Sequence, residues 1–130
     1  MDMTTSLMPS TSGRADPQLQ RALLGEAIDT AALAVFVFED DENYVAVNNA
    51  ACELSGYTRE ELLDLPLRRL AADPEQTVQN LVRVASGERT AGSARMRRKD
   101  GTVIDVEYRA SRATIAGMPF LVAVYWRVDA

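Results

Sequence analysis

The sequence of 130 residues contains no histidine and a single cysteine, Cys52. Histidine is the commonest metal ligand and general base in proteins and the usual axial ligand of haem, so its absence argues against all three roles. A single cysteine can form no disulfide within the chain, which fits a protein of the reducing cytoplasm. Because Cys52 lies in a short apolar segment, we expect a small buried side chain rather than a reactive thiolate.

Long apolar runs and an excess of basic residues are also missing. No segment reaches the roughly 20 apolar residues that cross a bilayer, and the N-terminus lacks the basic and apolar regions of a signal peptide. Residues 1–16 are instead rich in Ser, Thr and Pro, which predicts a disordered segment. The net charge of −5 argues against a nucleic-acid-binding protein. The remaining residues, 17–130, have the length and apolar content of one globular domain.

The order of helix and strand signals predicts the fold class. A helix begins at Asp16-Pro17, where an N-cap precedes proline, and its apolar residues recur at helical spacing over residues 17–29. The other expected elements are strands 34–39 and 43–47, short helices 49–55, 59–63 and 66–71, a longer helix after Asp73, and strands 89–98, 102–111 and 119–128. This order predicts an α+β fold, a five-stranded antiparallel sheet with helices on one face and a flanking N-terminal helix.

Several boundaries carry specific capping or turn chemistry. Gly56 stands where a left-handed residue ends a helix, and Thr58 with Glu61 forms a capping box at the start of the next one. Asp100-Gly101 predicts a hairpin turn with both residues at positive φ. These signals fix the connections between the expected elements.

The segment Tyr44–Asp64, YVAVNNAACELSGYTREELLD, combines a strand, an Asn turn, a short helix, a glycine stop and a capped helix start. That order resembles the PAS domain family. The resemblance extends to AVFVFEDD at residues 34–41, to the hairpin RMRRKDGTVIDVEYRAS at 95–111 and to the last strand at 120–129. The chain departs from the family pattern at Asp64, where Gly is common, and at Arg127, where the family's terminal Asp often lies.

The resemblance implies a sensory or protein-interaction module of a bacterial cytoplasmic signalling protein, with a signalling partner in the same chain or in another. A domain that only dimerises, without any ligand, is the alternative. A third possibility is a small isomerase of α+β fold, which needs a buried carboxylate of raised pKa. The expected interior contains no carboxylate, so we expect a protein without catalytic activity.

PAS domains bind small molecules between the sheet and the helices, and ligand sites in general are concave and mostly apolar. Alternation along the strands, together with the resemblance, predicts the residues that face this space. They are Phe36, Phe38, Val45, Val47, Leu54, Leu63, Leu70, Leu81, Val82, Met96, Val106, Tyr108, Leu121, Ala123 and Tyr125. Such a lining suits an apolar ligand such as a fatty acid, unless the side chains fill the space themselves.

The last strand, from Phe120 to Trp126, has no polar alternation, which is typical of a strand covered on both faces. The outer face therefore needs a cover, which is the helix 17–29, a second subunit, or both. We expect a homodimer, with the helix paired to the partner or packed on its own sheet. The expected interface residues are Leu19, Leu23, Ala27, Val122, Val124 and Trp126.

We expect no cofactor. Haem bound through histidine is excluded by composition. In flavin-binding photoreceptors of the family a helix carries a reactive Cys beside Asn, whereas residues 65–72 here contain neither, and Tyr125 stands where those proteins place Gln. The acidic clusters 40–42 and 73–75 suit a turn and a helix start, so we expect no metal site.

Overall fold

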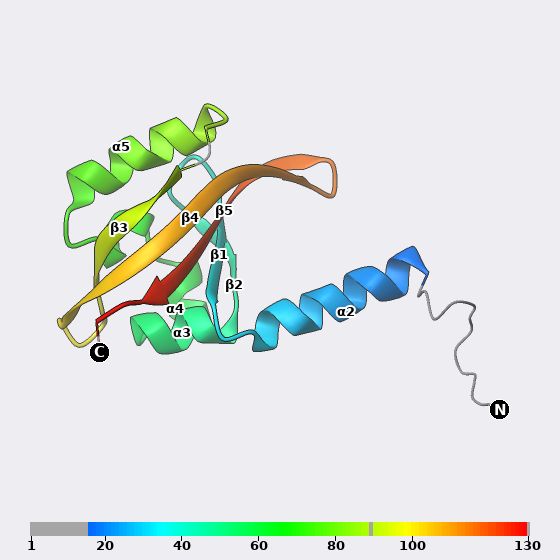
Figure 1. The fold of residues 1–130 in the computed structure, drawn as a ribbon, viewed down its shortest axis with the longest axis horizontal. Coiled ribbons are helices and arrows are strands. Elements are labelled where there is room, and N and C mark those ends of the chain that lie inside the picture. The colour runs from blue at the N-terminus through cyan, green and yellow to red at the C-terminus, as the bar shows by residue number, and fades with distance from the viewer. Residues whose placement is uncertain (1–15, 89, 130) are drawn as a thin grey trace.

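The computed structural model describes residues 16–88 and 90–129, so most of the segment expected to be disordered, residues 1–15, lies outside the described residues. The elements are α2 (Pro17–Thr30), β1 (Ala34–Phe38), β2 (Tyr44–Val47), α3 (Asn49–Ser55), α4 (Arg59–Leu63), the 3₁₀ helix η2 (Leu67–Leu70), α5 (Pro74–Ala85), β3 (Thr90–Arg97), β4 (Val103–Ile115) and β5 (Met118–Arg127). The five strands form one antiparallel sheet in the order β2-β1-β5-β4-β3 (Figure 1). The predicted fold class is confirmed.

The core lies between one face of the sheet and the helices. α3 packs against β1, α4 against β2, and α5 against β3 and β4. Alternate residues of the strands point into this core, and the most completely buried large side chains include Phe36, Leu62 and Val106. None of the helices within the described ranges is long and apolar enough to cross a membrane.

The predicted caps form because each satisfies backbone N–H groups that a helix start leaves unpaired. Thr58 and Glu61 make both hydrogen bonds of the capping box at α4. Asp73 accepts a hydrogen bond from the backbone N–H of Gln76 at α5. Gly56, at φ 80°, ends α3 in the left-handed conformation that glycine adopts without strain.

The hairpin turns differ in detail from the prediction. Between β3 and β4 only Gly101 has positive φ, at 89°, so the expectation that Asp100 shares this conformation is wrong. The turn instead closes through a hydrogen bond from the N–H of Gly101 to the carbonyl of Arg98. Between β4 and β5 both Ala116 and Gly117 have positive φ, as a two-residue hairpin requires. This tight turn lets β4 continue to Ile115, beyond the predicted end at residue 111.

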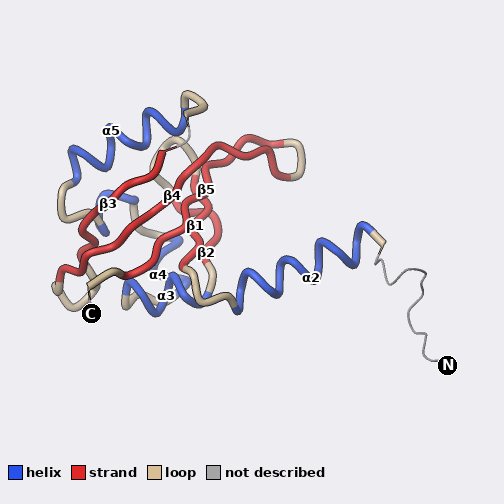
Figure 2. The backbone as a smooth tube through the Cα atoms, in the orientation of Figure 1, coloured by secondary structure: helices blue, strands red, loops and turns tan. Residues whose placement is uncertain are grey.

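The N-terminal helix α2 extends away from the sheet instead of lying over it (Figures 1 and 2). No residue of α2 is buried, although the helix contacts α3 at its C-terminal end. The sequence left two positions open for this helix, pairing with a partner or packing on its own sheet. The structure does not have the second of these.

Candidate functional site

Two small adjoining cavities lie between the sheet and the helices. The first, which we call the α5 cavity, has a volume of about 40 Å³ and lies beneath α5. The second, the η2 cavity, has a volume of about 30 Å³ and lies beside η2. A water molecule takes up about 30 Å³ in the liquid, so neither cavity as it stands accommodates the fatty acid that the sequence suggested.

The α5 cavity has a polar side that the sequence analysis missed. The side-chain amide of Asn80 donates a 3.0 Å hydrogen bond to the Tyr108 hydroxyl. Thr90 is only 6% exposed, and its Oγ1 has no hydrogen-bond partner among the described residues. Thr77 lines both cavities. Because buried hydroxyl groups are almost always hydrogen-bonded, the Thr90 hydroxyl needs an explanation of its own.

An aromatic cluster forms the other side of the cavities. The ring centroid of Phe36 lies 5.2 Å from that of Tyr44 and 5.4 Å from that of Tyr125, which it meets edge-on. The ring centroids of Tyr125 and Tyr108 are 5.6 Å apart. Burial raises the pKa of Tyr44 and of Tyr125, each also beside another tyrosine, so both phenols stay neutral at physiological pH. The cluster can therefore donate and accept hydrogen bonds but supplies no anion.

Most of the predicted interior residues face the core. Leu54 and Tyr125 are partly buried against it, and the following are buried: Phe36, Phe38, Val47, Leu70, Leu81, Met96, Val106, Tyr108, Leu121 and Ala123. The two cavities bring nine of these predicted residues together, namely Phe36, Phe38, Leu70, Leu81, Met96, Val106, Tyr108, Ala123 and Tyr125. Val47, Leu54 and Leu121 line neither cavity.

The predicted inward positions of Val45, Leu63 and Val82 are wrong, because these side chains are 39%, 40% and 62% exposed. A register shift between β1 and β2 breaks the alternation that placed Val45 inside. On α4 and α5 the neighbouring apolar residues Leu62 and Val84 face the core instead. In each case the strand or helix carries apolar residues on more than one of its sides, and the prediction chose a residue on the exposed side.

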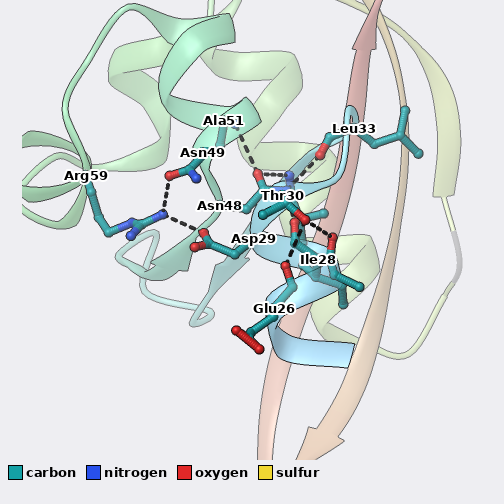
Figure 3. A network of polar contacts seen from close by, with 11 residues as sticks. Glu26, Ile28, Asp29, Thr30, Leu33, Asn48, Asn49, Ala51 and Arg59 are labelled. Atoms are coloured by element: carbon teal, nitrogen blue, oxygen red, sulfur yellow. Dashed lines mark hydrogen bonds and ion pairs between the residues drawn. The ribbon is translucent and has the colours of Figure 1, made fainter. Parts of the chain in front are cut away.

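A second polar site joins α2 to the domain, centred on the 3% exposed Asn48 (Figure 3). Its Oδ1 accepts hydrogen bonds from the backbone N–H groups of Val35, at 2.9 Å, and Ala51, at 3.0 Å. Its Nδ2 donates to the carbonyls of Ile28, at 2.6 Å, and Leu33, at 2.8 Å. One side chain thus connects the last turn of α2, the start of β1 and the start of α3.

Arg59 adds a second connection between α2 and the domain. Its guanidinium contacts Asp29 of α2 at 2.7 Å and Asn49 of α3 at 3.0 Å (Figure 3). Both charged side chains are nearly half exposed, so solvent weakens the ion pair and the buried Asn48 carries the larger share of the attachment.

A groove of about 470 Å³, the α2 groove, opens beside this junction. Its walls include Val35 and Val37, together with Val45 and Leu63, which the sequence had predicted to face the core. α2 contributes Gly25 and Asp29 among others. With 3.6 residues per turn, Gly25 and Asp29 lie on the side of α2 opposite Leu23 and Ala27. Of the three predicted interface residues of α2, Leu23 and Ala27 therefore point away from the groove.

The outer face of the sheet carries a row of half-buried apolar side chains, the outer stripe: Val35, Val37, Val122, Val124 and Trp126. Val35 pairs with Val124, and Val37 pairs with Val122. On the neighbouring strand the outward residues are polar, and Arg109 lies beside Val124. The stripe therefore has a defined edge at β4, and it includes the predicted interface residues Val122, Val124 and Trp126. α2 extends away from the sheet and does not lie over β5 (Figure 1).

Comparison with protein families identifies the fold. A family model described as PAS domain matches residues 33–125, which is most of the chain. The chain belongs to the PAS domain family. PAS domains are generally sensory, noncatalytic modules. A comparison with curated proteins found no match.

Solved structures of PAS domains have the same fold. The PAS domain of an HTR-like protein from Haloarcula marismortui has a TM-score of 0.75 at 20% identity, over 85% of this chain and 93% of that one. A PAS domain from a two-component sensor histidine kinase has a TM-score of 0.72 at 22% identity, covering 85% and 98%. An RNA-binding light-oxygen-voltage receptor has a TM-score of 0.78 at 26% identity, covering 92% of this PAS domain but only 36% of the receptor.

Proposed function

We propose that this PAS domain is a noncatalytic signalling module that works as a homodimer. The observation that carries the proposal is the apolar side of α2, which its own domain leaves uncovered. Leu19 is 49% exposed, Leu23 is 53% exposed and Leu24 is 62% exposed. Exposed apolar patches of this kind are typical of protein-protein interaction sites.

The outer stripe supports the same proposal. Its three β5 residues, Val122, Val124 and Trp126, are half-buried, and α2 does not lie over the strand that carries them. A second copy would bring a second α2 and a second stripe, so that each covers the other in a symmetric contact. The proposed contact surface is thus the stripe together with Leu19, Leu23 and Ala27.

The absence of carboxylates from the cavity linings supports a noncatalytic role. The groups that line the α5 cavity are apolar side chains, hydroxyls and one amide, and the only charged residue of the η2 cavity is Arg95. A general base of raised pKa therefore has no place in either cavity. Burial also raises the pKa of the thiol of the half-buried Cys52, which argues against a thiolate nucleophile at this position.

We further propose that the domain works without haem or flavin. The support is the small volume of both cavities, about 40 and 30 Å³, and the lack of histidine. Whether the dimer responds to a ligand or is constitutive then depends on what small molecule the cavities admit. Native mass spectrometry of the purified protein tests this point, since a mass excess that vanishes on denaturation reveals a bound molecule.

Light scattering coupled to size exclusion tests the dimer. At tens of micromolar we expect twice the protomer mass of 14.3 kDa, and we expect Leu23→Glu to be monomeric because it places a charge in the contact. Gln18→Glu is the matched control, since it adds the same charge on the opposite side of α2 and leaves the dimer intact. A monomeric wild-type protein, or equal effects of the two variants, would refute the proposed interface.

A further inference from the structure

The Thr90 hydroxyl is the one buried side-chain polar group within the described residues that has no hydrogen-bond partner. Thr90 begins β3, where it pairs with Ala110, and its side chain lines the α5 cavity. Leaving a buried hydroxyl unpaired is costly, and a polar group that borders a cavity can avoid this cost by bonding to a molecule inside it.

The chemistry of the cavity narrows the class of that molecule. No residue that lines the α5 cavity carries a charge, so an ion would lose its hydration without compensation. Four further polar side chains line the cavity, those of Thr77, Asn80, Tyr108 and Tyr125, and the side chains of Asn80 and Tyr108 are linked by a hydrogen bond. The floor is apolar and includes Ala110 and Ala123. A molecule that fits this lining is neutral, has at least one hydroxyl group and has a small apolar part.

The volume sets the size. About 40 Å³ admits a single water or a molecule little larger. The α5 and η2 cavities share four lining residues, Leu67, Thr77, Ala94 and Tyr125. Small rotations of the Leu67, Thr77 and Tyr125 side chains would join the two spaces. The upper limit is then a short-chain alcohol, far smaller than the apolar ligands suggested by the sequence.

We propose that the α5 cavity is a binding site for a small neutral molecule with a hydroxyl group, held by the Thr90 hydroxyl and by the Asn80–Tyr108 pair. The inference deepens the proposed signalling role, on which its biological meaning rests, by naming the class of molecule that the domain admits. Between β3 and α5, such a molecule would connect the sheet to the helix that covers it.

The first test is the sign of a stability change. Thr90→Val replaces the hydroxyl by a methyl group of nearly the same size. If a molecule in the cavity bonds to the hydroxyl, the melting temperature of the variant falls; if the cavity is dry, valine removes an unpaired polar group and the melting temperature rises. A rise would overturn the proposal. Thr114→Val, an exposed change on β4, is the control for replacing threonine by valine in a strand.

The second test is a titration of the full chain with methanol and ethanol, followed by amide chemical shifts in nuclear magnetic resonance. We expect saturable shifts at Thr90 and Asn80, with affinity weakened about tenfold in Thr90→Val, which corresponds to the loss of one hydrogen bond. Thr90→Ser keeps the hydroxyl and should keep the response. Shifts that drift without saturation, or that are equal in Thr90→Val, would overturn the proposal and leave water as the occupant.

Xenon provides the apolar comparison, because it enters dry apolar cavities. Xenon shifts at Thr90 without any alcohol response would show an apolar site and also overturn the proposal. The mass of the dimer is measured separately, so a monomeric protein with saturable alcohol shifts would refute the proposed interface and leave this site standing. A dimer without such shifts would support the proposed interface and refute the binding site in the α5 cavity.

Discussion

Replacing Asn48 tests how α2 is attached to the domain. Its side chain makes four hydrogen bonds while 3% exposed. Each contributes a net 0.5–1.5 kcal/mol in a typical protein, so Asn48→Ala removes about 4 kcal/mol if all four are lost. The Ile28 carbonyl lies at an exposed helix end and can bond to water instead, which reduces the expected loss to about 3 kcal/mol. For a domain of this size that lowers the melting temperature by about 12 °C.

Asn48→Asp separates the two halves of this network. Aspartate keeps an oxygen that can accept from Val35 and Ala51, and it remains a good N-cap for α3. It cannot donate to the carbonyls of Ile28 and Leu33, and its negative charge repels them. We therefore expect the sheet and α3 to persist while α2 detaches from the domain.

Two readouts distinguish these effects. The fluorescence of Trp126, the single tryptophan, follows urea unfolding of the sheet. Limited trypsin digestion after Arg21, the basic residue of α2, follows detachment of the helix. We expect faster cleavage in both Asn48 variants and a large loss of stability mainly in Asn48→Ala.

The neighbouring Asn49→Ala is the control, because this exposed side chain makes one hydrogen bond, to Arg59. We expect it to cost less than about 1 kcal/mol. The reasoning fails if the free energy of unfolding of Asn48→Ala lies within about 1 kcal/mol of the wild-type value. It also fails if Asn48→Asp leaves the rate of cleavage at Arg21 unchanged.

Two further predictions concern the core and the surface. Leu81→Ala should destabilise by about 3 kcal/mol through loss of buried contacts, whereas Val82→Ala, one position along α5, should stay within about 0.5 kcal/mol; urea unfolding compares them, and equal costs would contradict the observed helix phase. Arg68 donates two hydrogen bonds to the Glu42 carboxylate and thereby lowers its pKa, so this contribution to stability is present above the unfolded pKa of about 4.3 and is lost as the pH falls through the lower folded value. Glu42→Gln should therefore melt below the wild type near pH 6 and approach it near pH 3, and a gap that is independent of pH would show that the carboxylate charge does not matter.

The parts of the fold that the sequence predicts are those set by chemistry between near neighbours. Thr58 caps α4 by accepting a hydrogen bond from the backbone N–H of Glu61, three residues away. Gly56 ends α3 because glycine adopts the left-handed backbone conformation without strain. Both can be recognised without knowing what lies across the domain. The family signature between Tyr44 and Asp64 consists of such local signals, which is why the fold followed from it.

The candidate sites depend on contacts that are distant in sequence. The partners of Asn48 at Ile28 and Leu33 lie 20 and 15 residues away, so the sequence indicates its N-cap role but not its attachment of α2. Thr90 and Asn80 have no periodic signal, because a lone polar residue in a strand or a helix is usually solvated. Only the assembled core shows that they border a cavity.

The buried side of α5 was predicted only in part, for a different reason: Leu81 is buried as predicted, whereas Val82 is exposed. α5 carries apolar residues at 81, 82, 84 and 85, which support more than one buried side. In the structure Leu81 and Val84 are the buried residues of α5, because the helix packs against β3 and β4 through them, and this packing is not visible in the order of residues. The same ambiguity applies to the adjacent leucines at the end of α4.

The long hairpin between β4 and β5 has a consequence for how the molecule opens. Pairing with β1 ends at Leu121 and pairing with β3 ends at Ala110, so in the sheet ladders of the part of the chain that the structure describes, residues 111–120 pair only with each other. A two-stranded ribbon is marginal by itself in water. Its amides should exchange with deuterium through local fraying long before the rest of the sheet does, and a reporter sequence inserted at Ala116-Gly117 would leave the remaining strands paired.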